Sequence, residues 1–346
     1  MKKVTIIGKF ETANGISDGQ AVKTYIVANE LERVYGKDNV TKVNTFGWKK
    51  KPFGLLRKSV SAVRNSENVI FMTDEGGIKI FPWLLSLANV FTKRSIHYVV
   101  VGGWLIHFVP KHALLRWFLK RLDGVFVETT VMQKSLEDSG FRNVYLLPNC
   151  KDLIPLCDAQ LPSNHGELYR FCTFSRVMKE KGIEDAVNAV RNINAQYGRT
   201  ICTLDIYGPV DPMQTEWFEN LKQSFSDSIS YKGIVSYDKS VDVLKDYYAL
   251  LFPTLFYTEG IPGTIIDAYA AGVPVVASEW ESFNDVIDQN HTGWGYSFGK
   301  QECLKDILTM LIEHPERICE AKPKCLAKAR QYLPDSVIDI LLSKLS

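Results

Sequence analysis

The chain has 346 residues, of which 46% are hydrophobic and 23% charged, so it can bury sizeable cores and is not a disordered chain. No apolar run reaches the roughly 18 residues that a membrane span needs, and the first residues lack the long apolar segment of a signal peptide. The seven cysteines are scattered without a Cys-x-x-Cys pair, which excludes a disulfide framework and favours reduced thiols in a cytoplasmic protein.

Charge is unevenly distributed along the chain. Residues 1–150 hold 22 Lys and Arg against 12 Asp and Glu, a net charge of +10. The remaining residues hold 19 against 27, a net charge of −8. This split indicates two units that face different partners.

Short apolar runs alternate with amphipathic segments in the first half, which predicts βαβ units and a parallel sheet. A helix is expected at about 19–35, because Asp18 can cap it and Gly36 can end it. The predicted strands are residues 4–7, 40–45, 68–71, 97–101, 124–127 and 144–147.

The same pattern restarts after about residue 155. Helices are expected at 182–195, 213–226, 238–248, 264–271 and within the terminal run 300–344. Strands are expected at 171–174, 203–207, 229–232, 249–252, 273–277 and 293–296.

The polar stretch 158–167 is the best candidate for a linker between the two halves. The fold class is therefore expected to be α/β, with two Rossmann-like doubly wound domains that face each other across a cleft. The domains are expected at 1–157 and 158–332, with a C-terminal helix at about 333–346 packing back on the first. In such sheets ligands bind at the carboxyl ends of the strands.

Residues 256–277 run from a strand through a Gly/Pro loop into a helix and then another strand. Gly260 and Gly263 allow backbone amides to approach a ligand closely. Thr264 is a candidate N-cap, so the helix would present free N–H groups to an anion.

Two carboxylates stand near this helix start. Glu259 lies in the loop, and Asp267 is expected in the first helical turn, where both suit ligand hydroxyls. The spacing from Thr264 to Asp267 also fits a capping box, so Asp267 is equally well explained as a cap.

A second polar cluster, residues 174–184, follows the first strand of the second half and opens a helix. Arg176 and Lys181 would carry two cations to the strand end, which fits a diphosphate. The alternative is a charged turn in contact with solvent.

These motifs together resemble glycosyltransferase family four, of GT-B fold. Glu259 and Asp267 match its Glu-x7-Glu signature, and Arg176 with Lys181-Gly182 match its diphosphate motif. Further matches in the right order are Leu147-Pro148-Asn149, Asp205-Ile206-Tyr207-Gly208, Tyr231-Lys232-Gly233 and the run from Ala270 to Ala277.

The resemblance implies that a nucleotide-sugar donor binds mainly to the second domain. Arg176 and Lys181 would neutralise the diphosphate, Glu259 would hold the transferred sugar and Asp267 the ribose. The other residues implied to line the donor are Gly15, Gly208, Ile234, Val235, Gly260, Ile261, Pro262, Gly263 and Thr264.

The implied reaction moves a hexose or N-acetylhexosamine, with retention and without a metal or cofactor. The donor would be a UDP-sugar and the acceptor a saccharide, expected to be lipid-linked, in the synthesis of a cell-surface polysaccharide such as a capsule. The acceptor is expected to meet Gln20, Gly102, Gly103, Trp104 and His107 of the first domain.

The sequence departs from the family pattern at three points. Asp267 replaces the second Glu of the signature. Gly102-Gly103 stand where many members place a His, although His107 lies close by. The loop from Gly8 to Gly19 is less rich in glycine than usual.

Two basic segments with interleaved apolar residues, 48–58 and 111–121, resemble interfacial helices on anionic lipid. They would place the protein at the inner face of the cell membrane. Ordinary amphipathic helices with solvated basic faces explain the same pattern.

The main alternative function is an inactive GT-B-like subunit that anchors a partner enzyme, because Gly102-Gly103 occupy the usual His position. A nucleotide-sugar epimerase is disfavoured by the spacing of the signature. A nucleic-acid binder is disfavoured by the acidic second half.

Overall fold

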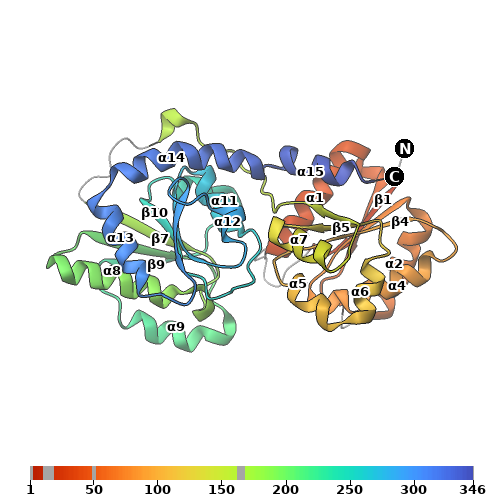
Figure 1. Cartoon of the computed structure of the whole chain (residues 1–346), viewed down its shortest axis with the longest axis horizontal. Helices are drawn as coiled ribbons and strands as arrows, with labels where there is room; N and C mark the ends of the chain where they lie inside the picture. Colours follow the sequence, from red (N-terminus) through yellow and green to blue (C-terminus); the bar gives the residue numbers. More distant parts are fainter. Residues whose placement is uncertain (1–2, 11–18, 49–51, 162–167, 346) are drawn as a thin grey trace. The chain divides into compact units, whose positions relative to one another are not determined.

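The computed structural model describes residues 3–10, 19–48, 52–161 and 168–345. It divides the chain into two compact units (Figure 1). Unit 1 comprises Met1–Asp152 and Tyr332–Ser346, and unit 2 comprises Leu153–Gln331. The sequence expectation placed the boundaries after residues 157 and 332.

Unit 1 is built on one parallel sheet in the order β2-β1-β3-β4-β5-β6. Its central strands are buried on both faces, which explains why they read as continuous apolar runs. The strands are β1 (Val4–Gly8), β2 (Val40–Asn44), β3 (Asn68–Met72), β4 (Ser95–Val99), β5 (Gly124–Val127) and β6 (Val144–Leu146).

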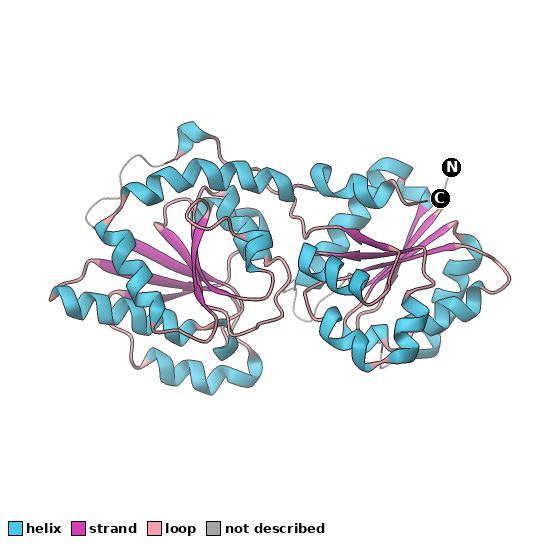
Figure 2. Cartoon of the chain, in the orientation of Figure 1, coloured by secondary structure: helices cyan, strands magenta, loops and turns pink. Residues whose placement is uncertain are grey.

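Helices cover both faces of this sheet (Figure 2). One core forms beneath α2, α4, α6 and α7, and the other beneath α1 and the C-terminal α15. The helices are α1 (Gly19–Tyr35), α2 (Pro52–Asn65), α3 (Glu75–Ile78), α4 (Phe81–Asn89), α5 (Leu105–Phe108), α6 (Ala113–Leu119), α7 (Thr130–Asp138) and α15 (Pro334–Leu342).

Unit 2 has a second parallel sheet, in the order β12-β11-β10-β7-β8-β9. Its strands are β7 (Tyr169–Phe174), β8 (Cys202–Tyr207), β9 (Ile229–Gly233), β10 (Ala249–Phe252), β11 (Val275–Glu279) and β12 (Gly293–Ser297). Its helices are α8 (Ile183–Tyr197), α9 (Thr215–Lys222), α10 (Ser240–Leu244), α11 (Gly263–Ala270), α12 (Phe283–Val286), α13 (Cys303–Glu313) and α14 (Glu316–Ala329).

The predicted α/β class with two Rossmann-like domains is confirmed, and each predicted strand overlaps an observed one. The helices differ more. The helix expected at 213–226 covers only Thr215–Lys222, whereas the helices expected within the terminal run 300–344 are present as α13, α14 and α15. In the part of the chain that the structure describes, no helix has the length and apolar character needed to cross a membrane.

Each sheet has one point at which the strand order reverses. In unit 1 the chain moves from β1 out to β2 and returns to β3, so this point lies between β1 and β3. In unit 2 it lies between β7 and β10. Loops that leave neighbouring strands at such a point diverge and open a space for a ligand.

Candidate functional site

The reversal point of unit 2 brings together the two loops that the sequence singled out. The loop after β7 carries Lys181 and Gly182, and the loop after β10 begins at Pro253. Gly182 has a φ of +67°, and a Cβ there would lie 1.9 Å from the carbonyl oxygen of Pro253. The backbone N–H of Leu255 donates to the carbonyl of Glu180 at 2.8 Å. The two loops are therefore in direct backbone contact.

This contact places Lys181 against Glu259, 78 residues along the chain. The ammonium of Lys181 donates to Oε1 of Glu259, which also accepts a 3.2 Å hydrogen bond from the Thr254 hydroxyl. The Lys181 ammonium lies 5.3 and 5.1 Å from the ring centroids of Phe252 and Phe256. Both charged side chains are largely shielded, with 18% and 16% of their surface exposed. Two groups with different expected roles thus occupy one small polar site.

Arg176 lies in the same loop but has another partner. Its guanidinium is 3.7 Å from the carboxylate of Asp211 and is half exposed. The loop is held against the end of β8, because a Cβ on Gly208 would lie 1.9 Å from the Ser175 carbonyl oxygen. Within the described residues, no hydrogen bond or ion pair joins Arg176 to Lys181 or Glu259. Of the two predicted cations, only Lys181 pairs with Glu259.

Helix α11 begins one residue before the predicted start, so the prediction of Thr264 as its N-cap is wrong. Pro262 occupies the cap position with extended backbone (φ −67°, ψ 125°), and helical geometry starts at Gly263. The proline ring has no acceptor, so no side chain caps the first turn. The Thr264 hydroxyl is buried and has no hydrogen-bond partner among the described residues. Uncapped N–H groups and a buried hydroxyl therefore stand at the positive end of the helix dipole.

Asp267 lies beyond the first turn of α11, contrary to the prediction. Its side chain is 2% exposed and accepts a 2.8 Å hydrogen bond from the hydroxyl of Ser240, the first residue of α10. The capping-box alternative also fails, because Thr264 is not the cap. Ser240 had no sequence signal, since nothing in the pattern relates α10 to α11.

The other predicted donor-side residues differ in exposure. Ile234 is 57% exposed and Val235 is half-buried, in the loop after β9. Across the end of the loop and the first two residues of α11, three residues are buried and two are half-buried. The buried ones are Gly260, Ile261 and Pro262, and the half-buried ones are Gly263 and Thr264.

The reversal point of unit 1 contains a pocket of about 290 Å³, near the lower limit for small-ligand sites. Phe46 and Trp48 come from the loop after β2, and Thr73 and Asp74 from the loop after β3. The Thr73 hydroxyl is buried without a hydrogen-bond partner in the described residues. The pocket is lined by Lys9, Gln20, Thr45, Phe46, Gly47, Trp48, Thr73, Asp74, Gly77 and Phe81.

Of the predicted acceptor-side residues, only Gln20 lines this pocket, and its amide donates to the carbonyl of Met72 at 3.1 Å. Gly102 has a φ of +83°, a conformation that L side chains rarely adopt, so glycine suits this position. Gly103 is buried and His107 is exposed, and the Trp104 indole donates to the carbonyl of Val101 at 3.0 Å. Gly15 lies outside the described residues.

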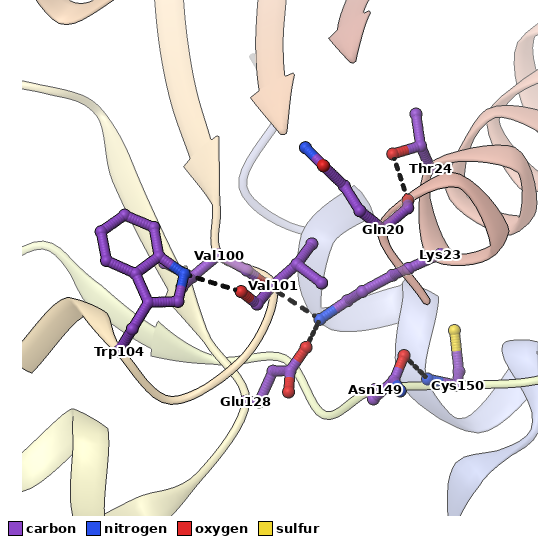
Figure 3. Close-up of polar contacts among 9 residues, drawn as sticks. All are labelled: Gln20, Lys23, Thr24, Val100, Val101, Trp104, Glu128, Asn149 and Cys150. Atoms are coloured by element: carbon purple, nitrogen blue, oxygen red, sulfur yellow. Dashed lines mark hydrogen bonds and ion pairs between the residues drawn. The ribbon is translucent and has the colours of Figure 1, made fainter. Parts of the chain in front are cut away.

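Lys23 and Glu128 form a buried ion pair near these residues, which the sequence did not predict (Figure 3). Lys23 of α1 donates to Glu128, just after β5, at 2.8 Å and to the carbonyl of Val100 at 3.1 Å. The two side chains are 1% and 2% exposed. Burial raises the pKa of the neighbouring Cys150 thiol to about 12, which keeps it protonated. The pair ties α1 to the ends of β4 and β5.

Part of unit 2 matches a known family. Residues 169–314 match the family model for glycosyl transferases group 1. One curated relative, the amylovoran biosynthesis glycosyltransferase AmsK of Erwinia amylovora, is 27% identical over 149 residues. This alignment covers 42% of the present chain and 36% of AmsK.

Solved structures extend the similarity to the whole fold. HepE of Anabaena, solved in complex with UDP, has a TM-score of 0.78 at 13% identity, covering 100% of this chain and 99% of HepE. Sucrose-phosphate synthase of Thermosynechococcus elongatus has a TM-score of 0.77 at 14% identity, covering 100% and 98%. The chain therefore has the GT-B fold, and its similarity to the group 1 glycosyl transferase model is confined to residues 169–314, less than half of the chain.

Proposed function

We propose that the protein is a retaining glycosyltransferase. It transfers a hexose or N-acetylhexosamine from a UDP-sugar to a lipid-linked saccharide acceptor. The product belongs to the synthesis of a cell-surface polysaccharide. The observation that carries the proposal is the contact of Lys181 with Glu259 beside the uncapped start of α11. Cation, carboxylate and free amides are the groups that a sugar diphosphate requires.

Each group has a separate role in the proposed reaction. Lys181 and Arg176, with the amides at the start of α11, stabilise the charge that develops on the leaving diphosphate. Glu259 accepts hydrogen bonds from the hydroxyls of the transferred sugar, and Asp267 accepts hydrogen bonds from the hydroxyls of the ribose. In this proposal these cations and amides, without a metal ion, balance the diphosphate charge.

The proposed transfer breaks the bond between the anomeric carbon and the β-phosphate oxygen. The acceptor hydroxyl oxygen forms the new bond on the same face of the sugar, and its proton passes to the leaving diphosphate. This route requires no separate protein base, and the configuration at the anomeric carbon is retained.

The pocket of unit 1 is proposed to bind the acceptor. Phe46 and Trp48 offer apolar surfaces to the flat faces of a sugar ring, and Gln20, Thr73 and Asp74 offer hydrogen-bonding groups to its hydroxyls. Its volume of about 290 Å³ suits one sugar unit better than an oligosaccharide.

Two relatives support the chemistry. HepE has been solved in complex with UDP, with UDP and glucose, and with UDP-glucose. AmsK is a glycosyltransferase of amylovoran biosynthesis. The donor and the polysaccharide setting proposed here follow these two proteins.

The test measures nucleotide release and nucleotide binding separately. UDP should raise the melting temperature more than ADP or GDP does. The variants R176A and K181A should each release UDP from UDP-sugars at least tenfold more slowly with unchanged folding. K179A removes an exposed cation from the same turn and is the matched control. Unchanged rates in K181A would refute the proposed site, and UDP binding with no transfer to any acceptor would favour the inactive anchoring subunit.

A further inference from the structure

The outer face of α2, α4 and α6 is unusual in its charge. The three helices with their flanking residues, 52–65, 81–94 and 111–122, contain nine Lys and Arg and none of the chain's 39 Asp and Glu. These segments thus account for most of the net charge of +10 that residues 1–150 carry. Without carboxylates, their cations have no side-chain counter-ions on their own helices.

The structure joins the three helices into one layer. Helix α2 packs on α4 and α4 packs on α6, on the same side of the unit 1 sheet (Figure 1). The rings of Trp83 on α4 and Phe118 on α6 are 4.3 Å apart, and the guanidinium of Arg94 reaches the Arg64 carbonyl at the end of α2 at 3.4 Å. The sequence suggested two separate basic segments, and α4 connects them.

Large apolar side chains project from each helix of this layer. Phe53 on α2 is 83% exposed, Leu87 on α4 is 75% exposed and Phe91 just after α4 is 94% exposed. On α6, Leu114 and Trp117 are about half exposed, and the guanidinium of the neighbouring Arg121 lies 3.4 Å from the Trp117 ring centroid. We call this outer surface of α2, α4 and α6 the basic apolar face.

The turn that presents Phe91 is held in place by its own side-chain hydrogen bonds. The Asn89 carbonyl oxygen accepts from the Arg94 N–H at 2.6 Å and from the Thr92 hydroxyl at 2.9 Å, and its amide donates to the Arg94 carbonyl at 2.7 Å. Lys93 closes the turn with a φ of +51°. The exposed phenyl ring is therefore presented by a braced turn.

We infer that the basic apolar face docks on an anionic phospholipid bilayer. Exposed aromatic and aliphatic groups enter the boundary between headgroups and acyl chains, and surrounding Lys and Arg attract anionic headgroups. A second copy of the chain is a poor occupant, because two faces that carry Lys and Arg without carboxylates repel each other. This inference stands on the face itself and does not depend on the proposed transfer reaction.

The test uses the full chain and vesicles, with no donor or acceptor present. The protein should sediment with vesicles of 70% phosphatidylcholine and 30% phosphatidylglycerol, and not with pure phosphatidylcholine. Binding should weaken between 0.1 and 0.5 M salt, because the attraction is partly electrostatic. Equal binding to both vesicles, or none to either, would overturn the inference.

Two variant pairs locate the binding surface. L87D/F91D and R57Q/K58Q should each reduce vesicle binding at least tenfold. The matched controls are I154D/M213D, at apolar side chains of unit 2 that are 90% and 95% exposed, and R191Q/R199Q, at exposed cations of α8 and the turn after it. Loss in the face variants alone supports the inference. Equal vesicle binding by the face variants and the control variants would overturn it. So would a wild-type protein that forms a dimer and does not bind vesicles, if L87D/F91D converts that dimer to monomers.

Discussion

Replacing Gly182 by alanine tests whether close contact of the two loops of unit 2 creates the candidate site. Gly182 and Gly198 stand at opposite ends of α8 with φ of +67° and +62°. An alanine at either position suffers the same left-handed strain, roughly 1–2 kcal/mol. Only at Gly182 does the new Cβ meet another atom, the Pro253 carbonyl oxygen at 1.9 Å, while Gly198 has nothing within 4 Å.

The magnitude follows from this geometry. Real Cβ atoms essentially never approach another heavy atom within 3.0 Å, so the two loops that carry Lys181 and Glu259 must move apart by about 1.1 Å or more. A displacement of about 1 Å at reacting groups lowers catalysis roughly 100-fold. G198A should therefore lower only stability, whereas G182A should also lower activity.

The assay compares the two variants by thermal unfolding and by UDP release. G198A should melt about 2–8 °C lower, at roughly 2–4 °C for each kcal/mol, and should keep its stabilisation by UDP. G182A should melt lower still, lose most of that stabilisation and turn over about 100-fold more slowly. Equal activity in the two variants would refute the claim that this loop contact organises the site.

Two further predictions concern unit 1. K23M removes the cation of the Lys23–Glu128 pair, whose side chains are 1% and 2% exposed, and should lower the free energy of unfolding by about 3–5 kcal/mol. The double variant K23M/E128Q should recover part of this loss. Unfolding curves of K23M that match those of the wild type would contradict the prediction. Burial lowers the pKa of His97 to about 4, partly opposed by Asp123, so its neutral form favours the folded state. Stability should therefore fall by roughly 3 kcal/mol as the pH drops from 6.5 to 4, and H97L should lose this component of the pH dependence.

The sequence predicted the strands better than the helices, for a physical reason. A strand inside a parallel sheet is buried on both faces and reads as an unbroken apolar run, as in Gly124–Val127 and Ala249–Phe252. Helix ends depend on local backbone geometry. At α11, Pro262 holds the N-cap position predicted for Thr264. Pro262 has an extended backbone, and helical geometry begins at the next residue, Gly263.

Contacts between distant residues had the weakest sequence signal. Lys23 reads as one polar residue in an apolar stretch, and nothing marks Glu128, 105 residues later, as its partner. Arg176 and Lys181 were both predicted to bind a diphosphate, and no sequence pattern indicated that Lys181 would pair with Glu259 and Arg176 with Asp211. Such pairings depend on strand order, which the local pattern of residues does not encode.

The strand order explains why one architecture provides two chemically different sites. Both sheets reverse their strand order once, and in both the candidate site lies where loops leave the carboxyl ends of the two strands at that point. Lys181, Glu259 and the start of α11 lie at the reversal point of unit 2. They suit an anionic ligand, although the second half of the chain carries a net charge of −8. Unit 1 lines its own with Phe46, Trp48 and polar groups that include the cation Lys9 and the carboxylate Asp74, although the first half is strongly basic. The few groups at each reversal point, and not the net charge of each half, therefore determine what each site can bind, while nine of the 22 Lys and Arg of residues 1–150 lie in the three segments of the basic apolar face.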